Sequence, residues 1–157
     1  MKYPKVTLFV FMAVLLFTSA CKTFEVKNVN YAQQVESVLI PTENGNVSDS
    51  RYGIAFNILP FQYEEMKDSS SVLVDEVRLI RNQNGFYFIT ADGFNNVYVM
   101  EPINSGLKLK EKINVTEQGL ISPAFNLRSP FVQLIDTETS EVYTLNEKGV
   151  KKEESKS

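Results

Sequence analysis

The sequence predicts an all-β protein: one antiparallel β-sandwich or small barrel of roughly eight to nine strands, which follows a cleaved export signal. Apolar and polar residues alternate with a period of two through much of residues 31–147, as in half-buried strands. Six Pro and seven Gly fall mostly between the alternating segments, where turns are expected. The length of 157 residues suits a single domain.

The predicted strands follow one another closely along the last two thirds of the chain. The segments with strand character are residues 52–58, 72–80, 86–91, 97–101, 107–115, 120–121, 124–125, 131–135 and 142–145. Asp75-Glu76 interrupt the second of these, which indicates either a bulge or two short strands, 72–74 and 77–80. Residues 86–91 are apolar on both faces, which indicates a central strand. Helices are expected only as short stretches around residues 31–35 and 61–67.

Two segments resemble each other. Residues 86–100 match residues 131–145 at an offset of 45 residues, with Phe86 aligned to Phe131 and the pair Val97-Tyr98 aligned to Val142-Tyr143. That offset is the length of a propeller blade. A closed propeller needs roughly four or more blades, and the chain has room for about three. Two similar hairpins in one sheet are therefore the simpler expectation.

The first twenty residues have the order of a secretory signal. Lys2 and Lys5 provide a positive start, residues 6–17 are apolar apart from Thr7, and the small residues Thr18-Ser19-Ala20 follow. The apolar part is too short to span a membrane comfortably. Residues 1–20 are therefore predicted to be removed from the mature protein.

The only cysteine comes directly after these small residues. The stretch Leu16-Phe17-Thr18-Ser19-Ala20-Cys21 resembles the lipobox of bacterial lipoproteins, with Thr18 where that family usually has Leu. The resemblance implies cleavage between Ala20 and Cys21, a diacylglycerol group on the Cys21 sulfur and an acyl group, such as palmitate, on the new amine. Two or three acyl chains hold a protein stably on a membrane.

An ordinary signal-peptidase site also fits Thr18-Ser19-Ala20 and would leave Cys21 as a free thiol. An unpaired, exposed thiol in an exported protein is reactive, so the lipid anchor is the favoured interpretation. In the lipoprotein family Asp typically follows the cysteine in proteins kept at the inner membrane. Lys22 in that position therefore implies the outer membrane, on either its periplasmic or its outer face.

The mature chain divides into three parts. Residues 21–30 form the lipidated start and a polar tether, residues 31–147 form the β-rich domain, and residues 148–157 form a charged tail that is expected to be disordered.

Composition excludes several kinds of chemistry. Without His and with one Cys, the chain has no Ser-His-Asp or Cys-His catalysis, no His-ligated zinc, no thiolate cluster and no internal disulfide. We therefore expect no catalytic residues, no metal and no cofactor. The mature chain has 14 basic and 19 acidic residues, a net charge of −5, which does not favour nucleic acid as a partner.

The segment 107–115 holds the candidate binding residues. Its odd positions are apolar except for Glu111, which is either a buried carboxylate with a raised pKa or a charge that protects a sheet edge. Its even positions carry Lys108, Lys110 and Lys112, which form either a surface for an anionic partner or a solvated face.

Other features have two interpretations. Residues 92–96, Asp-Gly-Phe-Asn-Asn, are either a weak calcium loop or, as we favour, an Asx-rich hairpin turn. Tyrosines offer a potential recognition face: Tyr52, Tyr63, Tyr87, Tyr98 and Tyr143. Acidic residues are available for a glycan hydrolase, though no spacing selects a pair among Glu64, Glu65, Asp68, Asp75 and Glu76.

The sequence thus predicts a membrane-anchored envelope lipoprotein without enzymatic activity. Its β-rich domain is expected to bind or support a protein complex or a glycan in the envelope. The alternatives are a soluble secreted inhibitor or immunity-type protein with an unmodified Cys21, and an Asp/Glu-based envelope hydrolase.

Overall fold

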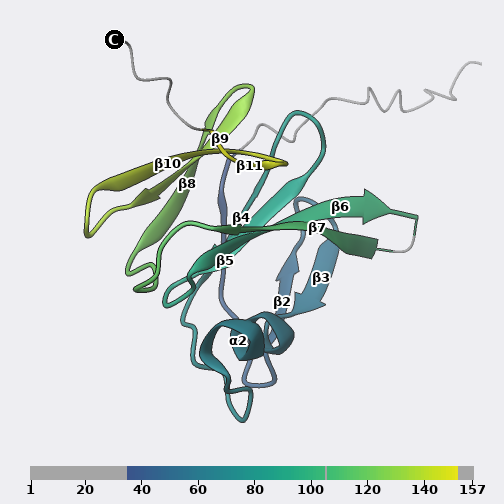
Figure 1. The fold of residues 1–157 in the computed structure, drawn as a ribbon. Coiled ribbons are helices and arrows are strands. Elements are labelled where there is room, and N and C mark those ends of the chain that lie inside the picture. Colours follow the sequence, from purple (N-terminus) through teal and green to yellow (C-terminus); the bar gives the residue numbers. More distant parts are fainter. Residues whose placement is uncertain (1–34, 105, 152–157) are drawn as a thin grey trace, which may run out of the picture. The chain divides into compact units, whose positions relative to one another are not determined.

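The structure is a computed structural model that describes residues 35–104 and 106–151. In this part of the chain, antiparallel strands form three sheets, and one short helix, α2 (Leu59–Met66), lies between them in sequence (Figure 1). The all-β prediction is confirmed. The predicted signal, Cys21, the tether and most of the predicted helix at 31–35 lie outside the described residues.

The first sheet has five strands in the order β1-β4-β5-β6-β7. Their bounds are Ser37–Leu39 (β1), Val77–Arg81 (β4), Tyr87–Ala91 (β5), Asn96–Ile103 (β6) and Gly106–Asn114 (β7). Every residue of β5 is buried, which confirms the prediction of a central strand.

The second sheet has four strands in the order β11-β10-β9-β8, and the third is the hairpin β2-β3. Their bounds are Pro123–Arg128 (β8), Phe131–Asp136 (β9), Glu141–Asn146 (β10), Gly149–Val150 (β11), Asn46–Asp49 (β2) and Ile54–Asn57 (β3). The strand β11 lies within residues 148–157, which the sequence predicts to be a charged tail.

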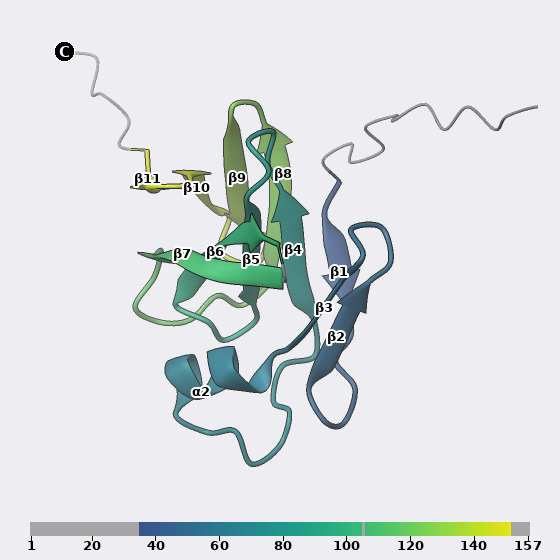
Figure 2. The same cartoon turned by 90° about the vertical axis from the view of Figure 1, so that its right-hand side faces the viewer.

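The first sheet buries both of its faces. On one face Leu79, Ile89 and Tyr98 belong to a core that also includes side chains of the hairpin and helix, among them Val47 and Phe61. On the other face, side chains such as Phe88 and Val99 form a second core with residues of the second sheet, among them Leu134 and Leu145. Figures 1 and 2 both show α2 below the first sheet and strands β8 to β10 above it.

The strand count and the barrel alternative need correction. The described residues contain eleven strands in three separate sheets, with no closed barrel among them. The additional strands β1, β2 and β11 are short, and β2 is mostly polar, so period-two patterning does not detect them. Residues 72–74 and 120–121, although apolar, are not strands.

The two similar hairpins are present but lie in different sheets, so the expectation that they share one sheet was wrong. β5 pairs with β6 in the first sheet, and β9 pairs with β10 in the second. Each hairpin is the middle of a four-stranded meander, β4 to β7 and β8 to β11 respectively. The meanders face each other across the second core. The sequence resemblance therefore reflects one structural pattern that occurs twice.

The helix α2 is the short helix that the sequence predicts near 61–67. Pro60 stands in its first turn, where the missing N–H costs no hydrogen bond. The helix ends at Lys67, which adopts a left-handed conformation (φ 60°) and donates its N–H to the Tyr63 carbonyl.

Candidate functional site

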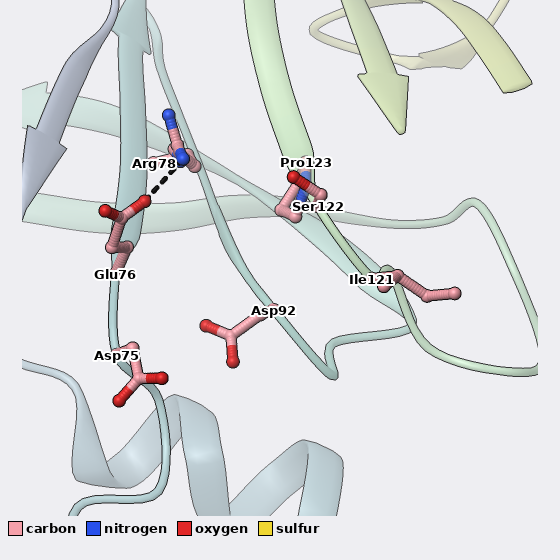
Figure 3. A pocket seen from close by; sticks show the side chains of 7 residues that line it. All are labelled: Asp75, Glu76, Arg78, Asp92, Ile121, Ser122 and Pro123. Atoms are coloured by element: carbon pink, nitrogen blue, oxygen red, sulfur yellow. Dashed lines mark hydrogen bonds and ion pairs between the residues drawn. The ribbon is translucent and has the colours of Figure 1, made fainter. Parts of the chain in front are cut away.

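A small polar pocket lies where the two meanders begin. Its volume is about 280 Å³. Its lining comes from the segment that leads into β4, the turn after β5 and the segment that leads into β8 (Figure 3): Asp75, Glu76, Arg78, Asp92, Ile121, Ser122 and Pro123. In Figure 3 the Asp92 carboxylate points toward the side of Asp75 and Glu76, whereas the Ile121 side chain points away.

Asp92 has one carboxylate oxygen without a partner. Its Oδ1 atom is buried and accepts no hydrogen bond within the protein. Burial raises the pKa of Asp92, and the charge of Asp75 adds to this, while the backbone N–H groups of Glu76 and of Asp92 itself act in the opposite direction. An unpaired buried acceptor costs free energy, so a hydrogen-bond donor that reaches this oxygen stabilises it.

The second meander has a similarly placed carboxylate, Asp136. Asp136 is the last residue of β9, and Asp92 is the first residue after β5; each lies close to the two residues that precede the first strand of its meander. Asp136 Oδ2 accepts the N–H of Ile121 at 2.7 Å, and its Oδ1 accepts the N–H groups of Ser122 at 3.2 Å and Glu138 at 3.1 Å.

The two aspartates differ in their pKa. Burial acts to raise the pKa of Asp136, but the backbone N–H groups that it accepts outweigh burial and lower its pKa. The pKa of Asp92 is raised. Asp136 is therefore a satisfied structural carboxylate, whereas Asp92, which lines a pocket, keeps one oxygen without a hydrogen-bond donor.

Arg78 does not provide a free cation in this pocket. It forms ion pairs with Glu76 and, at 3.4 Å, with Glu36. Glu36 also accepts the Phe125 N–H at 2.6 Å. Burial raises the pKa of Glu36, although the Phe125 N–H and the Arg78 charge partly offset this effect. The remaining carboxylates, Asp75 and Asp92, make the pocket an acceptor site for ammonium, amide or hydroxyl groups.

A β-bulge divides the predicted lysine stripe. The register of β6 and β7 shifts so that Val99 pairs with Glu111 and Met100 pairs with Leu109, which leaves Lys110 as an extra residue. Because one extra residue exchanges the two faces of a strand, the alternation cannot continue through this point. The stripe on one face was therefore a wrong prediction.

The separated side chains have different partners. Lys112 bonds Glu64 of α2 at 2.5 Å, and Lys110 lies 4.9 Å from the centre of the Phe86 ring. Lys108 is exposed and pairs across the strands with Glu101. Glu111 is exposed, so its interpretation as a buried carboxylate is wrong, and its place on the edge strand β7 fits the alternative of an edge charge.

Glu65 of α2 forms hydrogen bonds that hold the asparagine-rich segment 92–96 in place. Its carboxylate accepts the Asn95 N–H at 2.8 Å, the Asn96 side-chain N–H at 2.8 Å and the Tyr98 hydroxyl at 2.5 Å. Burial and this carboxylate together raise the pKa of Tyr98 strongly. The segment is a turn held by α2, and residues 35–104 and 106–151 contain no group of three acidic or Cys side chains placed to hold a metal ion.

The five tyrosines do not form one recognition face. Tyr87 and Tyr98 are buried in the first core, whereas Tyr143 packs against the second. Tyr143 also donates its hydroxyl to Glu141 at 2.6 Å, and burial together with this carboxylate raises its pKa to about 12. Only Tyr63 is clearly exposed.

Sequence reasoning placed Asp92 in a turn and missed its pocket. The 45-residue offset aligns the turns after β5 and β9, but it places Asp92 opposite Thr137 and Ala91 opposite Asp136, so it gives only an approximate signal for the two aspartates. The different surroundings of the two carboxylates come from residues 75–76 and 121–122, which are distant in sequence. The predicted cleavage and lipidation residues, Ala20 and Cys21, lie outside the described part.

Comparisons with known protein families, with curated proteins and with solved structures found no significant match to this chain. In the part of the chain that the structure describes, no helix is both long and apolar enough to cross a membrane.

Proposed function

We propose that this chain is a bacterial outer-membrane lipoprotein, anchored through acylated Cys21, whose β domain is a non-enzymatic binding or accessory module of the envelope. The observation that carries the proposal is the position of the only cysteine directly after Thr18-Ser19-Ala20 at the end of an export signal. Because the mature chain has a net charge of −5, we expect it to contact the membrane through the lipid and not through basic residues.

We further infer that the two facing sheets constitute a β-sandwich, to which the hairpin β2-β3 and α2 add a second apolar layer. Their shared core supports this description. Such a scaffold holds the pocket at Asp92 on segments that lead into and out of strands, which gives a binding site fixed geometry.

The binding part of the proposal rests on Asp92. A partner whose amide, ammonium or hydroxyl group reaches the buried Oδ1 atom from the pocket supplies the donor that this atom lacks. Envelope proteins and glycans both carry such groups, so the partner class is a protein or a glycan.

The anchor is tested by metabolic labelling with radioactive palmitate. The wild type is expected to incorporate label and Cys21→Ala to incorporate none. Thr18→Leu, which creates the usual lipobox residue, is the matched control and retains labelling. An unlabelled wild type, or equal labelling of Cys21→Ala, overturns the anchor and favours the soluble secreted protein.

The binding site is tested by co-purification of the tagged full chain from detergent-solubilised envelope. Partners recovered with the wild type are expected to be reduced with Asp92→Asn. The control Asp68→Asn removes the same charge from an exposed loop and leaves recovery unchanged. Equal recovery with Asp92→Asn removes this pocket from the proposal.

A second candidate function, the Asp/Glu-based hydrolase, has one observation in its favour. Asp75 and Asp92 line the same pocket, and the pKa of Asp92 is raised, as for a general acid. The pocket volume of about 280 Å³ is, however, at the lower limit of small-molecule sites. Release of fragments from labelled envelope glycan by the wild type but not by Asp92→Asn would establish this function.

A further inference from the structure

A second pocket lies between the hairpin β2-β3 and the first sheet. Its volume is about 570 Å³, twice that of the Asp92 pocket. Its lining residues come from β3, the adjoining turn, α2, β5, β6 and β7: Gly53, Ile54, Ala55, Phe56, Phe61, Ile89, Met100, Gly106 and Leu107. None of these side chains is polar or charged.

The pocket is partly open to solvent and lies beside the first core. Its volume is sufficient for a ligand, because an apolar cavity of roughly 150 Å³ already holds a benzene molecule. The larger pocket arises because the hairpin is a separate sheet that does not hydrogen-bond to the first sheet. As a result Ile54, Phe56 and Phe61 pack against the first core while remaining only partly buried.

The lining also determines which molecule is stable there. The lining side chains offer water no hydrogen bond, and only backbone groups of the lining do so. A hydrocarbon chain needs no hydrogen-bond partner and gains about 0.8 kcal/mol for each CH₂ that it buries against these side chains.

We propose that this pocket binds the hydrocarbon chain of a fatty-acyl lipid, with the polar headgroup outside the apolar lining. The lining includes Ile89 and Met100 from β5 and β6, Ile54 and Phe56 from β3, and Leu107 from β7. This site is independent of the acyl groups proposed for Cys21 and of the Asp92 pocket.

The test uses a palmitic acid analogue that carries a photoreactive diazirine. The full chain is reconstituted in phosphatidylethanolamine–phosphatidylglycerol vesicles, illuminated with the probe, and digested for peptide mapping. Labelling is expected to be saturable and to fall on peptides that contain the pocket residues. Absence of label there, or labelling that does not saturate, overturns the proposal.

Two substitutions introduce a larger side chain at the pocket lining, one on β7 and one on β3. Leu107→Trp and Ile54→Trp are each expected to raise the half-saturating probe concentration by at least about tenfold. Leu109→Trp is the matched control, because Leu109 is on the same strand, is 45% exposed and does not line the pocket. Unchanged saturation in both filled variants, with urea midpoints near that of the wild type, contradicts the proposal.

The result of the lipid-labelling experiment can be distinguished from the result of the test for the membrane anchor. Because the label is mapped by peptide, the result does not depend on whether Cys21 is acylated. A lipid-binding pocket in a chain without an anchor, and an anchor on a chain without a lipid-binding pocket, are distinct results.

Discussion

Asp92 and Asp136 show how one residue type near the same turn of two similar hairpins acquires two chemical roles. Asp136 is 2% exposed and accepts several backbone N–H groups, so its carboxylate joins the turn after β9 to the segment that leads into β8. Asp92 lies beside a pocket with a buried oxygen that has no partner. The two aspartates therefore permit matched tests of stability by single substitutions.

Asp136→Asn is expected to destabilise the protein by about 1–3 kcal/mol at pH 7, because buried backbone N–H groups lose a charged acceptor. The pKa of Asp136 is lowered in the folded state, so its stabilising contribution is present above the ordinary Asp pKa. That contribution disappears as the pH falls through the folded pKa. Urea unfolding of both proteins at pH 7 and near pH 3 measures this, and a pH-independent difference contradicts the assignment.

Asp92→Asn is expected to leave the urea midpoint at pH 7 unchanged or higher. The pKa of Asp92 is raised by burial, so folding disfavours its ionised form, and stability is lost as the pH rises from the ordinary Asp pKa through the folded value. The neutral amide of the Asn variant does not ionise, so this loss of stability is absent. At acidic pH the free energy of unfolding of the variant should therefore approach that of the wild type. A loss of more than about 1 kcal/mol at pH 7 would instead assign Asp92 a structural role like that of Asp136.

At the scale of elements, Glu65 attaches α2 to the sheet through the turn before β6 and through Tyr98. Tyr98→Phe removes a buried hydrogen bond to a carboxylate and is expected to cost about 1.5–3 kcal/mol. Amide hydrogen exchange in α2 and in the turn at residues 92–96 should become faster. Lys112→Gln, which breaks the exposed pair with Glu64, is the control and should cost no more than about 1 kcal/mol. Similar losses in the two variants would argue against the attachment.

Elements that depend on local pattern are predictable from this sequence. The apolar segment of β5 and the short helix each follow from neighbouring residues. The bulge at Lys110 is not predictable in this way, because it depends on how β7 pairs with β6. Since period-two reasoning assumes a continuous strand, it placed Lys112 and Lys110 on one face, whereas they contact Glu64 and Phe86 respectively.

For the same reason the binding pockets were beyond sequence reasoning. The Asp92 pocket combines residues near positions 75, 92 and 122, and the apolar pocket combines positions 53 to 107. Sequence similarity between the hairpins indicated a repeated pattern, but the assignment of the two hairpins to facing sheets depends on packing across the second core.

At the scale of the whole described unit, the second core should make the two meanders unfold together. Phe88 is fully buried between them, and Phe88→Ala is expected to cost about 3–5 kcal/mol through lost burial and the cavity that remains. Unfolding monitored by hydrogen exchange should show one transition shared by β5 and β9. Val142→Ala, at a position 53% exposed, should change stability by no more than about 0.5 kcal/mol. Separate transitions for the two meanders would contradict a shared core.

The central claim also concerns the whole molecule. It is that lipid on the first mature residue holds the β domain at a bacterial membrane. The most direct measurement is the intact mass of the mature protein purified from bacterial envelope, together with the mass of its N-terminal peptide. We predict a chain that begins at Cys21 and is heavier than the polypeptide by a diacylglyceryl group and an additional acyl group. A chain that begins at Cys21 with the mass of the unmodified polypeptide would contradict the claim.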